Sequence, residues 1–113
     1  MKPGAIVLIR FPQADLQTGK LRPALVVATA PGRHPDLLLA MISSRIVQVA
    51  PNFDEIIDPS DSDYAATGLK TRSVIRLARL VTVEPAIINA RLGTISGKRL
   101  QDVKAHLVNW LSK

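Results

Sequence analysis

Two apolar runs separated by a short turn place the strongest constraint on how this chain folds. Residues 22–29 read Arg-Pro-Ala-Leu-Val-Val-Ala-Thr and residues 36–43 read Asp-Leu-Leu-Leu-Ala-Met-Ile-Ser. Runs of this length and composition, bounded by a turn rich in Gly and Pro, are typical of β-strands. The sequence therefore predicts an antiparallel hairpin around the turn at residues 30–35.

The spacing of this hairpin predicts a functional pair at its open end. If Thr29 faces Asp36, counting outward brings Arg22 opposite Ser43, and directly opposed residues have Cβ atoms about 5 Å apart. Pro23 biases Arg22 to an extended backbone. A guanidinium beside a hydroxyl, where loops leave the sheet, suits a phosphate ligand or phosphoryl chemistry. A slip of one residue would break the pair.

Further short runs rich in β-branched residues extend the predicted sheet. A break or turn residue follows most of them. The turn-and-strand pattern of the whole chain predicts a small, strongly bent antiparallel barrel or sandwich that is mainly β. The expected strands outside the hairpin are residues 5–11, 45–49 past a bend, 55–57, 73–77, 79–83 and 92–95, with a short helix from Pro85 to Ala90.

The last segment changes its period and predicts a C-terminal helix. Leu100, Val103, Leu107, Trp110 and Leu111 follow the i, i+3, i+4 spacing of an amphipathic helix. Ser96 is the expected N-cap, and Lys98 and Arg99 in the first turn oppose the helix dipole. Trp110 is expected to pack this helix on the sheet.

Length and composition favour one globular domain spanning residues 1–113. Hydrophobic residues make up 47% of the chain, and no apolar run approaches the roughly 20 residues that span a bilayer. The chain has no cysteine and only two histidines, so a thiolate metal site is excluded and a zinc site is disfavoured. We expect a cytoplasmic protein without membrane association that works without a metal or cofactor.

The charge is large and unevenly distributed. The formal net charge is +6, yet residues 46–69 contain no Lys or Arg and five acidic residues, from Asp54 to Asp63. A basic body with one acidic segment favours a polyanionic partner, most simply nucleic acid. The alternative is a basic protein with no such ligand.

Each candidate residue also has a purely structural interpretation. Arg22 could form a surface ion pair, for example with Asp15, and Ser43 and Ser44 could hydrogen-bond the backbone of a turn. A Ser-His hydrolase is disfavoured, because His34 lies at the far end of the hairpin, roughly 20 Å from Ser43 at about 3.3 Å per residue.

A histidine acid–base pair and a basic strand face are two further possibilities. His34 with His106 could act as the acid–base pair, although an exposed helix position is favoured for His106. The run Lys70, Arg72, Arg76, Arg79 suits phosphate positioning or a solvated strand face. With four aromatic residues in the chain, a base-stacking platform is not expected.

Several blocks of the chain together resemble the PemK/MazF family of toxins. They are Gly4-Ala-Ile-Val-Leu-Ile-Arg-Phe-Pro, Gly19-Lys-Leu-Arg-Pro-Ala-Leu-Val-Val, Leu39-Ala-Met-Ile-Ser-Ser, Gly68-Leu-Lys-Thr-Arg-Ser-Val-Ile-Arg-Leu and Arg91-Leu-Gly-Thr-Ile-Ser. Their order and spacing match over nearly the whole chain, and the Lys-x-Arg-Pro block is the most specific. The resemblance implies a homodimeric SH3-like barrel of the PemK/CcdB type.

The resemblance also implies an activity and partners. The family activity is metal-free, sequence-selective cleavage of single-stranded RNA, held inactive by a cognate antitoxin, and the toxin–antitoxin complex binds operator DNA. The 2′-hydroxyl attacks the adjacent phosphate and leaves a 2′,3′-cyclic phosphate and a 5′-hydroxyl end. The catalytic residues correspond to Arg22 and Ser43. Lys20, Ser44, Arg45 and Arg79 are candidates to hold flanking RNA.

The chain departs from the family pattern at several positions. The usual acidic residue after Gly4 is Ala5, and the usual acidic-Gln-x-Arg stretch reads Ala78-Arg79-Leu80-Val81. The acidic residues usual at the start of the last helix are absent. Two alternatives therefore stay open: a toxin that inhibits DNA gyrase as CcdB does, with Trp110 near the C-terminus, and a nucleic-acid-binding homologue without catalysis.

Overall fold

The fold is a curled antiparallel sheet with one long helix, as seen in a computed structural model that describes residues 1–10 and 20–113. Six strands form one sheet in the order β4-β5-β3-β2-β1-β6. The prediction of a mainly β fold with a C-terminal helix is confirmed. The strands are β1 (Ala5–Ile9), β2 (Arg22–Thr29), β3 (Leu37–Ser43), β4 (Glu55–Ile57), β5 (Ser73–Val83) and β6 (Ala90–Thr94), and the helices are η1 (Ile46–Gln48), α1 (Tyr64–Thr67), η2 (Pro85–Ile87) and α2 (Gly97–Leu111).

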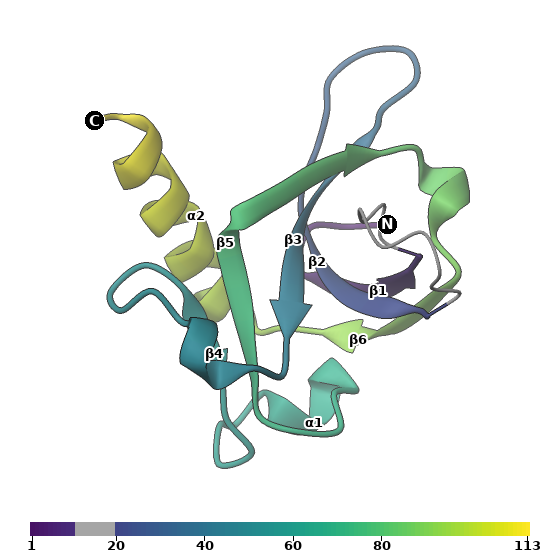
Figure 1. The fold of residues 1–113 in the computed structure, drawn as a ribbon. Helices are drawn as coiled ribbons and strands as arrows, with labels where there is room; N and C mark the ends of the chain where they lie inside the picture. The colour runs from purple at the N-terminus through teal and green to yellow at the C-terminus, as the bar shows by residue number, and fades with distance from the viewer. Residues whose placement is uncertain (11–19) are drawn as a thin grey trace.

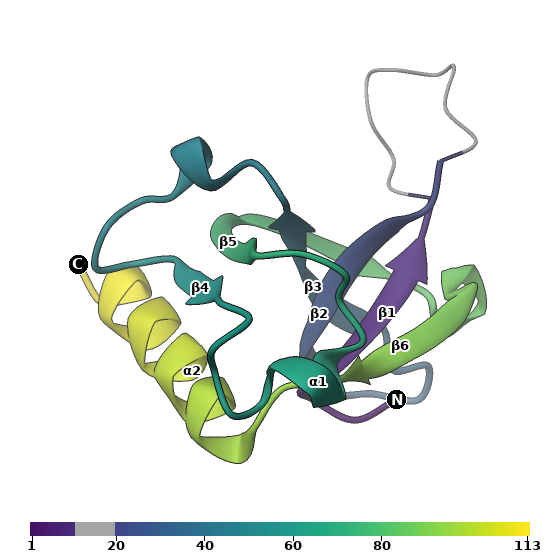
Figure 2. The ribbon, with the colours of Figure 1, turned by 90° about the horizontal axis from the view of Figure 1, so that it is seen from below.

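The sheet separates two apolar clusters because side chains alternate between its faces. Inside the curl, Val7, Ile9, Val26 and Leu39 pack together with no exposed surface. On the outside, Val103 and Leu107 of α2 cover the second cluster, which includes Leu25, Ile42 and Ile75. Figures 1 and 2 show α2 lying against this outer side of the half-barrel. Within the described residues, no helix is long and apolar enough to cross a membrane.

The β2–β3 hairpin forms with the predicted strands but with one local difference in register. Thr29 pairs with Leu37 rather than with Asp36, so the sequence prediction is wrong by one residue at the turn. A bulge between Val26 and Ala28 then shifts the pairing by one, so that Ala24 pairs with Met41. The ladder beyond the bulge therefore has the register that the sequence predicted for its open end.

β5 is a single strand of 11 residues, where the sequence predicted two shorter ones. It bends sharply in the middle (Figure 1). Arg76 pairs with Met41 of β3 while Leu80 pairs with Ala40, so residues 77–79 bulge out of the ladder. The backbone N–H of Leu77 donates to Asp54 Oδ1 at 2.9 Å, which satisfies a donor that the bulge removes from the sheet.

Two predicted elements differ in kind from those observed. Residues 45–49 do not continue the sheet, because Ile46–Gln48 forms a 3₁₀ turn whose Val47 is 91% exposed. The helix predicted from Pro85 to Ala90 is only the short turn η2 (Pro85–Ile87), and β6 already begins at Ala90. Phe11, the expected end of the first strand, lies outside the described residues.

The C-terminal helix begins as predicted, since the Arg99 N–H donates to Ser96 Oγ at 3.1 Å. Trp110 packs edge-on against Phe53, at 5.3 Å between ring centroids, so it contacts the loop before β4. His106, expected to be exposed, is partly buried, with Nδ1 2.6 Å from the carbonyl oxygen of Phe53.

Arg99 joins α2 to the acidic segment and is not merely an unfavourable charge at a helix start. Its guanidinium donates to Asp63 at 2.9 Å, to Asp61 at 2.8 Å and to the carbonyl of Ile56 at 2.8 Å, and lies 3.4 Å from Glu55. The Arg99 bond lowers the pKa of Asp63 from 3.8 to about 2, against the opposing effect of burial. Most of the acidic segment is therefore engaged within the chain.

Candidate active site

An arginine-rich pocket lies near η1, at the start of β2, the end of β3 and the bend in the middle of β5. It has a volume of about 220 Å³. Its position follows from the strand periodicity, since alternate residues of β3 that form the inner apolar cluster are followed by Met41 and Ser43 on the same face. The pocket is lined by Arg22, Met41, Ile42, Ser43, Arg45, Gln48, Arg76 and Arg79.

Arg22 and Ser43, the residues predicted to carry the chemistry, both line this pocket. The β2–β3 ladder extends to the pair of Ala24 with Met41, and the same register continued by two residues brings Arg22 opposite Ser43. Ser43 Oγ accepts the N–H of Arg45 at 3.0 Å and lies 3.3 Å from Gln48 Oε1, to which it donates. Ser43 therefore makes the turn hydrogen bond expected of a serine at a strand end, and its hydroxyl still lines the pocket.

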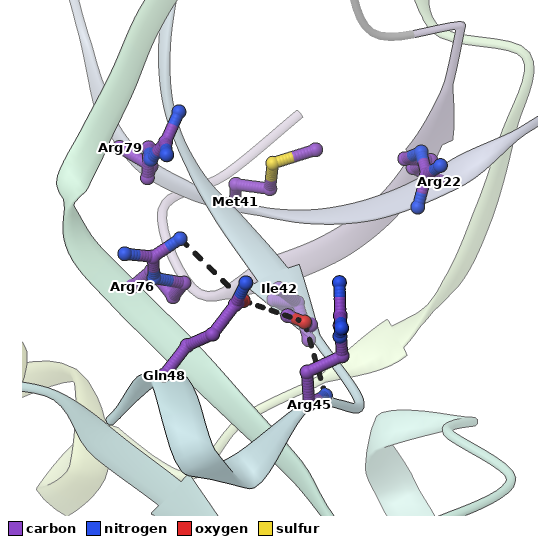
Figure 3. A pocket seen from close by; sticks show the side chains of 8 residues that line it. Arg22, Met41, Ile42, Arg45, Gln48, Arg76 and Arg79 are labelled. Atoms are coloured by element: carbon purple, nitrogen blue, oxygen red, sulfur yellow. Dashed lines mark hydrogen bonds between the residues drawn. The ribbon is translucent and has the colours of Figure 1, made fainter.

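Arg76 and Arg79 line the other end of the pocket, across Met41 from Arg22 (Figure 3). Arg76 Nη1 donates to Gln48 Oε1 at 3.5 Å, and its Nε is buried without a hydrogen-bond partner. Gln48 was not predicted, because residues 45–49 were expected to form a strand. Gln48 follows the β-branched pair Ile46 and Val47, and nothing in this pattern indicates that a 3₁₀ turn brings the Gln48 side chain to Ser43 and Arg76 of the sheet.

The pocket carries a concentration of positive charge. Four of its eight lining residues are arginines and none is acidic. Among the described residues, none of these four guanidiniums forms an ion pair, whereas Arg72 and Arg99 do. Like charges brought together without counter-charges raise the local potential and attract anions.

A second, more apolar hollow adjoins the first and shares Arg22, Ser43 and Arg45 with it. Leu21, Pro23 and Leu69 contribute apolar surface, and Ser44 and Lys70 contribute polar groups. Of the predicted binding residues, Arg45 lines both hollows, Ser44 lines the second and Arg79 lines the first. Lys20 is exposed and lines neither.

The two imidazoles are not brought together in either hollow. His34 lies beside Pro85 and Glu84 in a separate depression, and His106 contacts the loop before β4. Within residues 1–10 and 20–113, no group of three or more His, Cys, Asp or Glu side chains could hold a metal ion. Asp15, the proposed ion-pair partner of Arg22, lies outside the described residues.

The fold and the cationic pocket together define a small half-barrel protein with a site suited to anions. A family model described as "PemK-like, MazF-like toxin of type II toxin-antitoxin system" matches residues 2–111, and the chain therefore belongs to this family. The family includes endoribonucleases, and membership implies a cognate antitoxin partner. No curated protein matches the chain in a sequence comparison.

Proposed function

We propose that this toxin is a metal-independent endoribonuclease that cleaves single-stranded RNA in the cytoplasm until its antitoxin binds. The observation that carries the proposal is the meeting of Arg22 and Ser43 in a pocket whose other lining residues include three more arginines. Guanidinium groups bind phosphate in two-pronged hydrogen bonds and stay charged at any physiological pH.

In the proposed reaction, the ribose 2′-oxygen forms a bond to the adjacent phosphorus as the bond from phosphorus to the 5′-oxygen breaks. The 2′-hydroxyl loses its proton to solvent, and the leaving 5′-oxygen gains one. The products are a 2′,3′-cyclic phosphate and a 5′-hydroxyl end. Arg22 stabilises the negative charge that develops on the phosphorane. Ser43 Oγ exchanges its hydrogen bond to Gln48 Oε1 for one to a non-bridging oxygen, and both residues act mainly through electrostatic stabilisation.

Proton transfer by a pocket side chain is not needed for this mechanism. The described residues that line the pocket include no carboxylate or imidazole, and a guanidinium keeps its proton at any physiological pH. The same lining disfavours a bound metal cation, since four guanidiniums would repel it. Both points support a rate enhancement that comes chiefly from charge stabilisation and orientation.

The second hollow suits the sugar and base next to the cleaved phosphate. Its apolar side chains can contact a base edge or ribose, while Ser44 and Lys70 supply hydrogen bonds. Aromatic residues are absent from its described lining, so base selection would rest on hydrogen bonds and shape more than on stacking. Sequence selectivity would then depend on this hollow, and overall affinity on the arginine pocket.

A nucleic-acid-binding homologue without catalysis is the second candidate, because the cationic pocket alone would bind phosphate. The gyrase-inhibitor alternative rests only on Trp110, whose ring is partly engaged with Phe53. We expect a homodimer, and operator DNA binding by the toxin–antitoxin complex, as for the family.

The test is cleavage of a long single-stranded RNA by the purified protein in EDTA. We expect cuts that end in cyclic phosphate and that disappear in Arg22→Ala, while the matched control Arg33→Ala, at the far turn of the hairpin, cleaves normally. Absence of cleavage at every enzyme concentration, with RNA binding retained, would refute the nuclease and favour the binding homologue. Absence of both would leave the gyrase inhibitor to be assayed.

A further inference from the structure

The β5 end of the arginine pocket has features that the proposed cleavage at Arg22 and Ser43 does not use. Arg76 comes from the ladder position opposite Met41, and Arg79 comes from the bulge in β5. Figure 3 shows their guanidiniums on one side of Met41 and that of Arg22 on the other. Two cationic groups therefore stand apart from Arg22 but within the same pocket.

The backbone spacing separates the two ends by more than one strand. β2 and β5 lie on opposite sides of β3, so Arg22 and Arg76 start about 10 Å apart across the strands, at about 4.8 Å for each neighbouring pair. They are also offset along β3 by the two residues from Met41 to Ser43, which adds about 7 Å in that direction. One phosphate contacted by Arg22 would leave the Arg76 end unoccupied. An extended nucleic-acid strand presents further phosphates at regular intervals, and these can reach a second cationic site.

The surroundings of the Arg76 guanidinium are unfavourable in the protein without a bound anion. Its Nε is buried and lacks a hydrogen-bond partner, and its Nη1 donates to Gln48 Oε1 over a long 3.5 Å. A partly desolvated charge without a counter-charge is unfavourable. A bound anion would supply the missing negative charge.

We propose that Arg76 and Arg79 form a second phosphate subsite, which binds a phosphodiester neighbouring the one at Arg22 and Ser43. Gln48 is a positioning residue, because its Oε1 receives both the Ser43 hydroxyl and Arg76 Nη1 and so joins the two subsites. The inference rests on the proposed nucleic-acid substrate but not on cleavage. Because the contacts are to phosphate, the subsite adds affinity irrespective of base sequence.

The experiment measures the affinity of a non-cleavable 2′-deoxytrinucleotide with two phosphodiesters as a function of salt. For single strands, the slope of log affinity against log salt falls by about 0.7 for each phosphate that the protein no longer neutralises. We expect a decrease of about 0.7 for Arg22→Ala, about 0.7 for Arg76→Gln/Arg79→Gln, and about 1.4 for the combined variant. Affinity at low salt should fall about tenfold for the double glutamine variant.

Two controls keep the result specific. Lys104→Gln removes an exposed charge from α2 and should leave the slope unchanged, and circular dichroism checks that each variant is folded. Gln48→Leu should weaken binding of the trinucleotide at low salt but leave the salt slope near that of the wild type, because Arg76 keeps its charge and loses only the group that orients it.

Two outcomes would refute the second subsite. In the first, the slope of the combined variant falls no further than that of Arg22→Ala, which means that all three arginines share one phosphate. In the second, the double glutamine variant binds the trinucleotide as the wild type does. Because binding is measured without turnover, these outcomes are independent of whether the RNA is cleaved. Loss of cleavage with the expected slopes would refute the nuclease and leave the subsite intact.

Discussion

Replacing Arg99 with methionine tests whether the acidic segment is held by one shared cation. The Arg99 side chain is 12% exposed and that of Asp63 is 9% exposed, so this ion pair is largely buried. Removing one member of a buried pair costs about 3–5 kcal/mol, because the other charge is left uncompensated. The lowering of the Asp63 pKa from 3.8 to about 2 corresponds to about 2 kcal/mol of that total. We expect a loss of about 3–4 kcal/mol in the free energy of unfolding at pH 7.

The pH dependence of this loss separates charge from packing. In the wild type, the lowered pKa of Asp63 contributes stability that is present above about pH 4 and is lost as the pH falls towards about 2. In Arg99→Met, the carboxylates of Glu55 and Asp63 lose the counter-charge that lowers their pKa values, so these pKa values rise. The folded variant then binds protons more readily than the unfolded chain, and its stability increases as the pH falls from 7 to 4. The difference between the two proteins should therefore shrink over this range.

The assay is urea unfolding followed by circular dichroism at pH 7, 5.5 and 4. Arg72→Met is the matched control, because Arg72 pairs with Asp58 at 3.1 Å on the surface, where its side chain is 50% exposed, and such pairs contribute about 0–1 kcal/mol. Adding Asp61→Asn and Asp63→Asn to Arg99→Met should restore part of the stability. A loss for Arg99→Met that stays constant from pH 7 to 4, or that matches the control, would refute the charge argument.

Four further substitutions test local packing, capping and the chemistry. Gly93→Ala would bring a Cβ within 2.1 Å of the carbonyl oxygen of Ala66, so we expect a loss of several kcal/mol or no folded protein, whereas Gly97→Ala meets nothing within 4 Å and should unfold at or above the wild-type temperature. Ser96→Ala removes the N-cap of α2 and should cost about 1 kcal/mol in urea unfolding; an unchanged midpoint would argue against the cap. Ser43→Ala should lower kcat/KM for RNA by about 10²-fold with little change in stability, and wild-type activity would exclude Ser43 from the mechanism.

The strands and the terminal helix were predictable because their signals are local. The apolar runs that form β1, β2 and β3 are separated by segments rich in turn residues, and the stripe around Val103 has helical spacing. The Ser96 cap likewise depends only on residues within one helical turn. Each of these signals lies within the segment that forms the element, so tertiary contacts reinforce it without changing it.

The irregularities were not predictable, because each depends on a neighbour distant in sequence. Counting along the β2–β3 hairpin predicted the register at its open end, although it missed both the shift at Thr29 and the bulge that reverses it. The bulge in β5 is matched by Asp54, 23 residues away, which accepts the freed N–H of Leu77. No pattern in either segment alone indicates this contact.

The role of Arg99 shows the same limit for charge. Viewed along the helix, a cation in the first turn is unfavourable. In the fold, Asp63 and Asp61 approach from residues 36 and 38 positions earlier and turn the same charge into a buried partner. The sequence gives the sign of each charge, but the contribution of that charge to stability depends on which groups the fold places beside it.

The departures from the family pattern have a consequence that follows from where the β5 bulge lies. Ala78 stands where the family usually has an acidic residue and Arg79 where it has Gln, so the bend gains two units of positive charge, and the loss of Arg at Val81 leaves the four-residue stretch with a net gain of one. Residues 78 and 79 lie in the bulge, outside the β3–β5 pairing, so the changes there leave the ladder undisturbed. Val81, where the family has Arg, lies beyond the bulge and pairs with Leu39. A more cationic rim strengthens the phosphate contacts, which are common to every sequence, relative to base contacts, which are not. Binding by this chain should therefore be more salt-dependent and less sequence-selective than binding by relatives with the usual residues, and Arg79→Gln should move both properties back.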